Sequence, residues 1–211
     1  MKKLIAGLTA VVLVFAVVSA EAAAKGKKGK TAKTMKAKKG VKDMTTDELI
    51  RTALGGAPEH ISKDASVMIH GLDGKLVEVK KGANGFVCLP DMSGQEDPDP
   101  ICADDAGFVW LTDMLNGTPK PVNASPGIAY MAKGGWHWEK DGKTVDSTMP
   151  GAKRVKEPPH WMIFWPFGAK ESMLPLYPDR FGAYIMYEGT PYAHLMIYQD
   201  PARLGTNPKK P

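Results

Sequence analysis

The sequence predicts an α+β fold, with a mostly antiparallel β-sheet of about six to eight strands, two short helices and one disulfide bond. Three observations support this prediction. Most apolar residues fall in short runs that are rich in β-branched and aromatic side chains and are bounded by glycine, proline or aspartate. Two segments repeat apolar residues at helical spacing, and the chain has two cysteines at loop spacing.

Residues 1–24 have the organisation of a secretory signal peptide. A basic start precedes an apolar run over 4–18, and small residues then place cleavage after Ala22 or Ala24. The apolar run has about 15 residues, which is short of the roughly 20 that a membrane-spanning helix needs. We therefore expect an exported bacterial protein, periplasmic or secreted, with no transmembrane segment in its mature form.

Residues 25–43 form a lysine-rich segment with nine lysines and one acid, a net charge of +8. Its like charges, its glycines and its lack of apolar periodicity predict a disordered tail. We interpret it as a spacer, and the alternative is contact with an anionic envelope surface. It has no aromatic residue to stack on bases, which argues against nucleic-acid recognition. Residues 44–211 carry 17 basic and 21 acidic residues, so the basic character belongs to the tail.

A single globular domain is expected over 44–200, followed by a flexible C-terminal tail at 201–211. The first element of this domain is a helix. Thr45 or Thr46 caps its start, acidic residues follow in its first turn, and Gly55 ends it.

Three strands follow the first helix. Alternating residues at 67–70 and 76–79 flank an Asp-Gly turn, which is a strong hairpin signal. A second glycine-rich turn leads to 86–89, so we expect a three-stranded antiparallel meander. Cys88 lies on its last strand, and Cys88 and Cys102 form an even pair that predicts one disulfide bond in an oxidising compartment. Closing a loop of this length contributes roughly 3 kcal/mol in the chain-entropy model.

The second helix follows an acidic loop at 90–100, whose carboxylates lack the spacing of a calcium-binding loop. Asp104 or Asp105 caps this helix, which runs to Leu115 and buries an apolar side against the sheet. A strand is expected next, at 127–132.

A hairpin with two tryptophans is expected at 135–143. Trp136 and Trp138 point to the same side of it, because strand side chains alternate. That side is either an exposed platform for a sugar or aromatic ligand or part of the core, and we favour the core. A mobile polar loop is expected over 144–159.

The last strands are the most apolar. Residues 161–165 are apolar on both strand faces, which predicts a central strand. Residues 183–187 and 192–198 are expected to form a closing hairpin across the turn at 188–191.

Several short motifs occur in a fixed order along the domain. They are Gly-Ala-Asn-Gly-Phe-Val-Cys at 82–88, Asp-Pro-Ile-Cys at 99–102, Pro-His-Trp-Met at 159–162 and Gly-Thr-Pro-Tyr-Ala-His-Leu-Met at 189–196. Together they resemble a family of exported bacterial proteins with no assigned function. The resemblance covers roughly 57–198 and implies a single exported domain. It implies no activity and gives no residue a catalytic role.

Two His-x-Met pairs carry the most specific chemical signal. His160 and Met162 share one face of their strand, and so do His194 and Met196. If the two strands are neighbours with these faces aligned, the imidazoles and thioethers converge in a set that suits Cu(I) far better than magnesium or calcium. The alternative is that the methionines fill the core while each histidine bonds a backbone carbonyl. Tyr192 is a further ligand-facing candidate beside the two tryptophans.

Signatures of common enzymes are absent from the sequence, including the nucleophile elbow, the zinc-binding His-Glu-x-x-His helix and the phosphate-binding loop. We therefore favour an exported binding or structural module, with copper as the candidate ligand, over an enzyme. The alternatives are a periplasmic enzyme whose acid–base site forms only in the fold, and an envelope-associated protein attached through 25–43. A histidine within hydrogen-bond reach of a carboxylate in a cleft would favour the enzyme.

Overall fold

The computed structural model describes four stretches of the chain, namely 40–92, 97–145, 147–180 and 182–204. The predicted signal peptide, most of the lysine-rich segment and the end of the chain lie outside these residues, and so does the proposed envelope contact. Short 3₁₀ helices, η1 at Val41–Asp43 and η2 at Pro201–Arg203, lie inside the two predicted tails. Pro201 is buried, so the folded part extends slightly past the predicted boundary at residue 200.

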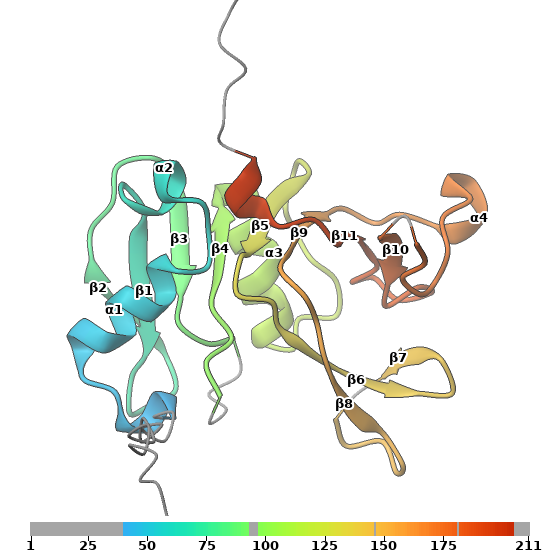
Figure 1. The fold of residues 1–211 in the computed structure, drawn as a ribbon, viewed down its shortest axis with the longest axis horizontal. Helices are drawn as coiled ribbons and strands as arrows, with labels where there is room; N and C mark the ends of the chain where they lie inside the picture. The colour runs from blue at the N-terminus through green and yellow to red at the C-terminus, as the bar shows by residue number, and fades with distance from the viewer. Residues whose placement is uncertain (1–39, 93–96, 146, 181, 205–211) are drawn as a thin grey trace, which may run out of the picture. The chain divides into compact units, whose positions relative to one another are not determined.

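The predicted α+β fold is confirmed (Figure 1). The helices are α1 Thr46–Leu54, α2 Glu59–Ser62, α3 Asp105–Leu115 and α4 Ala169–Ser172. The strands are β1 Ser66–His70, β2 Leu76–Lys80, β3 Phe86–Leu89, β4 Ile101–Asp104, β5 Gly127–Met131, β6 Trp136–Lys140, β7 Lys143–Val145, β8 Lys153–Lys156, β9 His160–Phe164, β10 Ala183–Met186 and β11 His194–Ile197.

Side chains of the residues just before them cap the N-terminal ends of both predicted helices. At α1, the Thr45 hydroxyl accepts a hydrogen bond from the Glu48 amide, and the Glu48 carboxylate accepts one from the Thr45 amide, which is a complete capping box. At α3, the Asp104 carboxylate accepts hydrogen bonds from the amides of Gly107, at 2.8 Å, and Ile128, at 3.0 Å. One cap therefore fixes both the start of α3 and the neighbouring strand β5.

The main sheet has eight strands in the order β10-β11-β9-β5-β4-β3-β1-β2. The closing hairpin of β10 and β11 is present, and β9 lies centrally between β11 and β5, as predicted. Every pair is antiparallel except β1 with β3. The prediction of an antiparallel meander over the first three strands is therefore wrong.

The chain reaches β3 by crossing the start of β1. A Cβ atom on Gly82 would lie 2.1 Å from the Ser66 amide nitrogen, so only glycine allows this close approach. The Gly82 amide donates to the Ser66 hydroxyl, and the Ala83 amide donates to the Asp64 carbonyl. Because of this crossing, β3 runs parallel to β1 and its other edge pairs with β4, a short strand that was not predicted.

The two faces of the sheet pack against different helices. Buried residues such as Val67, Cys88 and Cys102 cluster with Ala53 of α1. Alternate residues of the same strands face α3 and join the larger core, which includes Leu89, Ile101, Ala103, Trp110 and Leu111. The methionine-bearing parts of β5, β9 and β11 belong to this second face.

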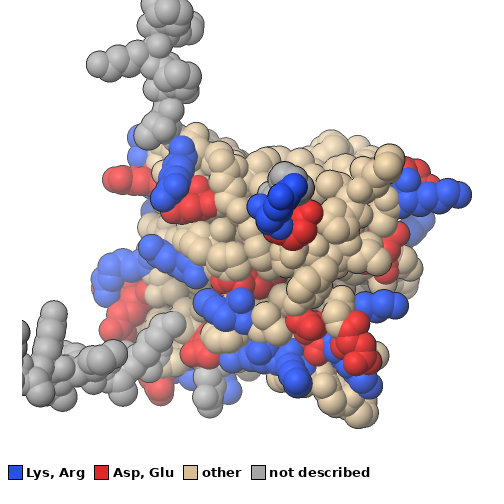
Figure 2. Space-filling model, turned by 45° about the vertical axis from the view of Figure 1, so that its right-hand side comes forward, with Lys and Arg blue, Asp and Glu red and all other residues tan. Residues whose placement is uncertain are grey.

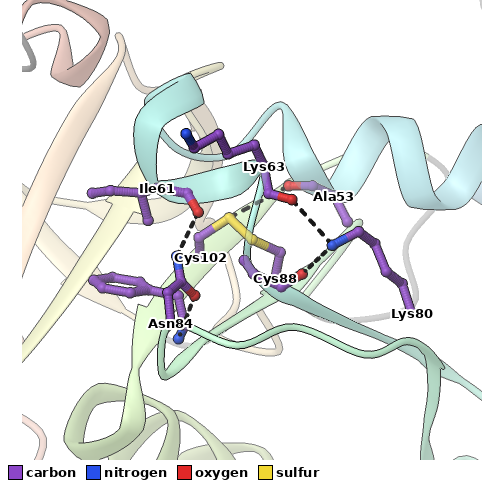
Figure 3. Close-up of a disulfide and its surroundings, with 9 residues drawn as sticks. Ala53, Ile61, Lys63, Lys80, Asn84, Cys88 and Cys102 are labelled. Carbon is purple, nitrogen blue, oxygen red and sulfur yellow. Dashed lines mark hydrogen bonds between the residues drawn. A yellow bond between two sulfur atoms is a disulfide. The ribbon is translucent and has the colours of Figure 1, made fainter.

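The disulfide bond joins Cys88 and Cys102, which are directly opposite each other on β3 and β4, and both residues are fully buried. Figure 3 shows side chains near the disulfide bond that donate hydrogen bonds to backbone carbonyls of the surrounding segments. The Lys80 ammonium donates to the carbonyls of Ala65 and Lys63, at 2.6 and 3.3 Å. The Asn84 amide donates to the Ile61 carbonyl at 2.7 Å. The Cys102 sulfur lies 3.5 Å from the Ala53 carbonyl oxygen, a van der Waals contact, since a disulfide sulfur carries no proton.

A second sheet of three strands has the order β7-β6-β8. The predicted hairpin of β6 and β7 is confirmed, but the predicted mobile loop at 144–159 contains β8, which pairs with the other edge of β6. The Lys-Arg-Val-Lys sequence of β8 has one apolar residue, so its edge position could not be recognised from alternation. Within β6 the buried residue is His137, while Trp136 and Trp138 are partly exposed, so our preference for a tryptophan core is not supported.

The surface carries both signs of charge. Figure 2 shows basic and acidic side chains interspersed on the face in view, without a large area of one sign. This mixed surface agrees with the sequence, in which the excess of basic over acidic residues comes from the lysine-rich segment and not from the domain. None of the helices in the described ranges combines the length and the apolar character needed to cross a membrane.

Candidate functional site

The two His-x-Met strands are neighbours, and their histidines and methionines lie on the same buried face. Neighbouring strands add further methionines in register. The directly opposed pairs on this face are Met162 with Met196, Met131 with His160, and Met186 with His194.

The antiparallel register keeps the two imidazoles apart. With Met162 opposite Met196, the His160 ring lies beside Tyr198, at 5.6 Å between ring centroids, and the His194 ring lies beside Phe164, at 5.3 Å. Four residues along the strands separate the two histidines, which corresponds to roughly 13 Å at 3.3 Å per residue. The four side chains therefore share a face and line one cavity, but the register sets the backbones of His160 and His194 well apart along it.

Both imidazoles are neutral and have a fixed tautomer. Nδ1 of His160 lies 2.8 Å from the Pro158 carbonyl oxygen, and Nδ1 of His194 lies 2.9 Å from that of Tyr192. A carbonyl only accepts, so each Nδ1 carries the proton and each Nε2 carries the lone pair. Burial lowers the pKa of His160, and it lowers the pKa of His194 to about 4. A neutral imidazole that is held by a backbone carbonyl is the form that binds metals.

A polar cluster lies at the His160 end of this face. Oε1 of Glu157 accepts hydrogen bonds from the hydroxyls of Tyr184 and Tyr198, at 3.1 and 2.9 Å. The same oxygen lies 3.1 Å from Nδ1 of His137, and Oε2 lies 3.9 Å from Nε2 of His160. The small sheet supplies His137, the segment after β8 supplies Glu157, and the main sheet supplies the rest.

Glu157 is charged although its side chain is only 4% exposed. Burial alone would raise its pKa, but the contact with His137, the positive charge that His160 carries in its protonated form and the Tyr198 hydroxyl bring the pKa below its ordinary value. The site therefore holds a buried negative charge at neutral pH.

A cavity of about 50 Å³, which we call the inner cavity, lies between α3 and the sheet. His137 and His160 both line it, and Nε2 of each is buried without a hydrogen-bond partner among the residues that the structure describes. Thioethers line much of the remaining wall, together with His194 and Glu157. The methionines are Met92, Met114, Met131, Met162, Met186 and Met196.

A second cavity of about 170 Å³ adjoins the first, and we call it the acidic vestibule. Its walls include the carboxylates of Asp91, Asp97 and Asp99 and the side chains of Trp138 and Arg154. Five residues line both cavities. They are Met92, Met114, Trp136, His137 and Tyr187.

Asp99 connects the vestibule with the polar cluster. A Cβ atom on Gly135 would lie 3.0 Å from Oδ1 of Asp99, 3.4 Å from Oε2 of Glu157 and 2.7 Å from the terminal carbon of Met131. The absence of a side chain at Gly135 therefore lets two carboxylates and a thioether approach each other. Burial, followed by the charges of Asp91 and Glu157, raises the pKa of Asp99 to about 7.

The aromatic candidates from the sequence are held within the fold. The Tyr192 hydroxyl donates to the Thr118 carbonyl at 2.6 Å, and its ring packs edge-on against Trp110. The Trp136 ring is covered by the Arg154 guanidinium, 4.1 Å from its centroid, and by the Lys156 ammonium at 4.7 Å. Neither ring forms an open stacking platform on these surfaces.

Sequence reasoning missed three residues of the site, namely His137, Glu157 and Asp99. Each lies in a segment interpreted as a hairpin or a polar loop, and its burial depends on contacts between the two sheets. Within the described part of the chain, no three His, Cys, Asp or Glu residues are arranged to hold a metal ion. Any metal site among these residues would therefore need a donor of another type, such as methionine sulfur.

Comparisons with protein-family models, with curated proteins and with solved structures found no match to this chain. The resemblance carried by the short motifs stays a prediction, and the chemistry of the site is the remaining guide to function.

Proposed function

We propose that the protein is an exported binding module that holds a soft monovalent cation, such as Cu(I), in the inner cavity. One observation carries this proposal. His137 and His160 line a cavity rich in thioethers, and Nε2 of each is buried and lacks a hydrogen-bond partner among the described residues. Imidazole and thioether are the donor types that suit Cu(I), whereas hard cations prefer oxygen.

The size and charge of the cavity support the same ligand class. A volume of about 50 Å³ accommodates an ion and at most one or two waters, since a water's share of liquid volume is about 30 Å³. A drug-sized organic ligand needs several hundred Å³. The buried charge of Glu157 balances one positive charge, which favours a monovalent ion.

The candidate ligands lie at one end of the methionine-bearing face. Met131 is directly opposite His160, and Met162 is two residues along the strand from His160 on the same side. Met131, His160 and Met162 form the proposed donor set together with His137. This set retains His160 and Met162 from the four residues that the sequence predicted. His194 and Met196 line the same cavity toward its other end.

The disulfide bond supports the export part of the proposal. Such bonds form and persist in oxidising compartments and are rare in the cytosol. A buried disulfide in this chain is therefore consistent with the signal peptide that the sequence predicts.

Replacing Met131 and Met162 with leucine should weaken Cu(I) binding at least tenfold, as measured by competition with a chromophoric Cu(I) chelator. Leucine preserves volume and apolar character, so the fold should tolerate the change, which circular dichroism checks. The matched control is Met149→Leu, because Met149 is 42% exposed and lies outside the cavity wall. Absence of binding to the unmodified protein at micromolar concentrations, or equal binding by the double variant, would reject the proposal.

A second candidate function is acid–base catalysis. The observation that favours it is the 3.1 Å separation between Nδ1 of His137 and Oε1 of Glu157, because His137 also lines the acidic vestibule. The inner cavity is too small for an organic substrate, so a substrate would bind in the vestibule and meet His137 there.

Under this second reading, hydrolysis of activated esters or glycosides should fall at least a hundredfold in His137→Asn and persist in the variant with Met131 and Met162 replaced by leucine. Product release from a panel of chromogenic substrates provides the assay. Turnover that is indistinguishable from the buffer blank, or insensitive to His137→Asn, would exclude the enzyme.

A further inference from the structure

We infer that the acidic vestibule is the route by which cations enter the inner cavity. This inference rests on the proposed function, because it concerns how the same site is loaded. The vestibule and the inner cavity share part of their walls, and His137 belongs to both. A cation that reaches the vestibule therefore meets His137, which is one of the proposed ligands.

The carboxylates of the vestibule lie at different depths. Asp97 lies at the rim, where its carboxylate pairs with the Arg154 guanidinium at 3.0 Å. Asp91 and Asp99 lie deeper, at 0% and 7% exposure. Oδ1 of Asp99 has no hydrogen-bond partner within the described ranges, and it approaches Glu157 at Gly135. Because Arg154 offsets Asp97 at the rim, the deep carboxylate of Asp99 is the group that would attract a cation, and low-dielectric walls strengthen that attraction.

His137 gives an independent indication that a ligand passes this point. Its side chain is 4% exposed, and neither ring nitrogen makes a well-directed hydrogen bond to another described residue. An imidazole with a lone pair at the boundary of the two cavities would accept a soft cation from the carboxylates and pass it to the thioethers.

A second opening competes with this route. An open groove of about 610 Å³ lies between the β1–β2 turn and α3, and it shares one wall residue, Met92, with the inner cavity. Its one acidic side chain, Asp73, lies 3.6 Å from the Lys75 ammonium, so the two charges offset each other. The groove therefore shares less of its wall with the inner cavity and has a weaker attraction for cations.

The test measures how fast the protein takes up Ag(I), which has the charge and ligand preference of Cu(I) and needs no reductant. Stopped-flow tryptophan fluorescence follows loading, because Trp110 and Trp136 line the cavity. At pH 8 and low salt, Asp99→Asn should slow loading at least threefold and reduce its salt dependence. Arg154→Gln should accelerate loading, and Asp73→Asn, in the groove, should leave it unchanged.

Equilibrium titration with Ag(I) separates this inference from the proposed function. Binding by the unmodified protein supports the cavity, and absence of binding rejects both. If Asp99→Asn lowers affinity as much as it lowers the rate, Asp99 acts on the bound ion and the entry route is wrong. The route is equally wrong if Asp73→Asn is the variant that loads slowly. Asp97→Asn, at the exposed rim, replaces Asp99→Asn should the latter misfold, and the same slowing is expected.

Discussion

Replacing Cys88 and Cys102 together with alanine is expected to lower the free energy of unfolding by about 4 kcal/mol. The bond closes a loop with a sequence separation of 14 residues, for which the chain-entropy model gives roughly 3 kcal/mol. Both sulfurs are fully buried, so truncation to alanine adds about 1 kcal/mol of lost packing. Urea denaturation followed by tryptophan fluorescence measures the difference.

The control for this prediction is a reducing agent added to both proteins after unfolding. Reductant should bring the unmodified protein close to the double variant and leave the double variant unchanged. A loss of less than about 1 kcal/mol would show that β3 and β4 hold their register without the covalent bond.

The disulfide bond is connected to the candidate site through β4, the strand that carries Cys102. β4 ends at Asp104, whose carboxylate caps α3 and also accepts the Ile128 amide of β5. β5 in turn places Met131 opposite His160. We therefore expect the double variant to bind Cu(I) more weakly at temperatures near its unfolding midpoint and normally well below it.

The elements that could be predicted from the sequence are those with local signals. The capping residues Thr45 and Asp104 fix helix starts through side chains within three residues, and the Asp-Gly turn fixes the β1–β2 hairpin. The parallel pairing of β1 with β3 and the edge strand β8 depend on contacts between segments distant in sequence. Gly82 shows the difficulty, because its role becomes clear only when Ser66 is known to lie against it.

The site shows the same division. Strand alternation correctly placed each histidine on the same face as the methionine two residues later, but it does not set the register between strands. A shift of the pairing between β9 and β11 by one residue would have turned these side chains to the other face of the sheet. In the observed register Met162 lies opposite Met196, and the two imidazoles lie at opposite ends of this methionine pair. His137 and Glu157 become neighbours because β8 pairs with β6, and the charged sequence of β8 gave no strand signal from which this pairing could be predicted.

Asp99→Asn is expected to stabilise the protein at pH 8 by about 4 kcal/mol and to leave it unchanged near pH 4. Burial raises the pKa of Asp99 from 3.8 to about 7, so between these values the folded state holds a proton that the unfolded state has released. The free energy of unfolding therefore falls as pH rises through this window, at about 1.4 kcal/mol per unit. Asparagine mimics the protonated carboxyl and cannot ionise, so this fall disappears in the variant.

Denaturation curves from pH 4 to pH 8 for both proteins give the difference. Burial lowers the pKa of His194 to about 4, so His194 makes the free energy of unfolding rise with pH between about 4 and 6.5, but this contribution is common to both proteins and cancels. A difference that does not grow with pH would contradict the burial of an ionisable Asp99. If the growth is observed, Asp99 is a residue that lowers stability at neutral pH, and such residues are retained where function requires them. Stabilisation together with slower Ag(I) uptake in the same variant would identify that function as cation entry.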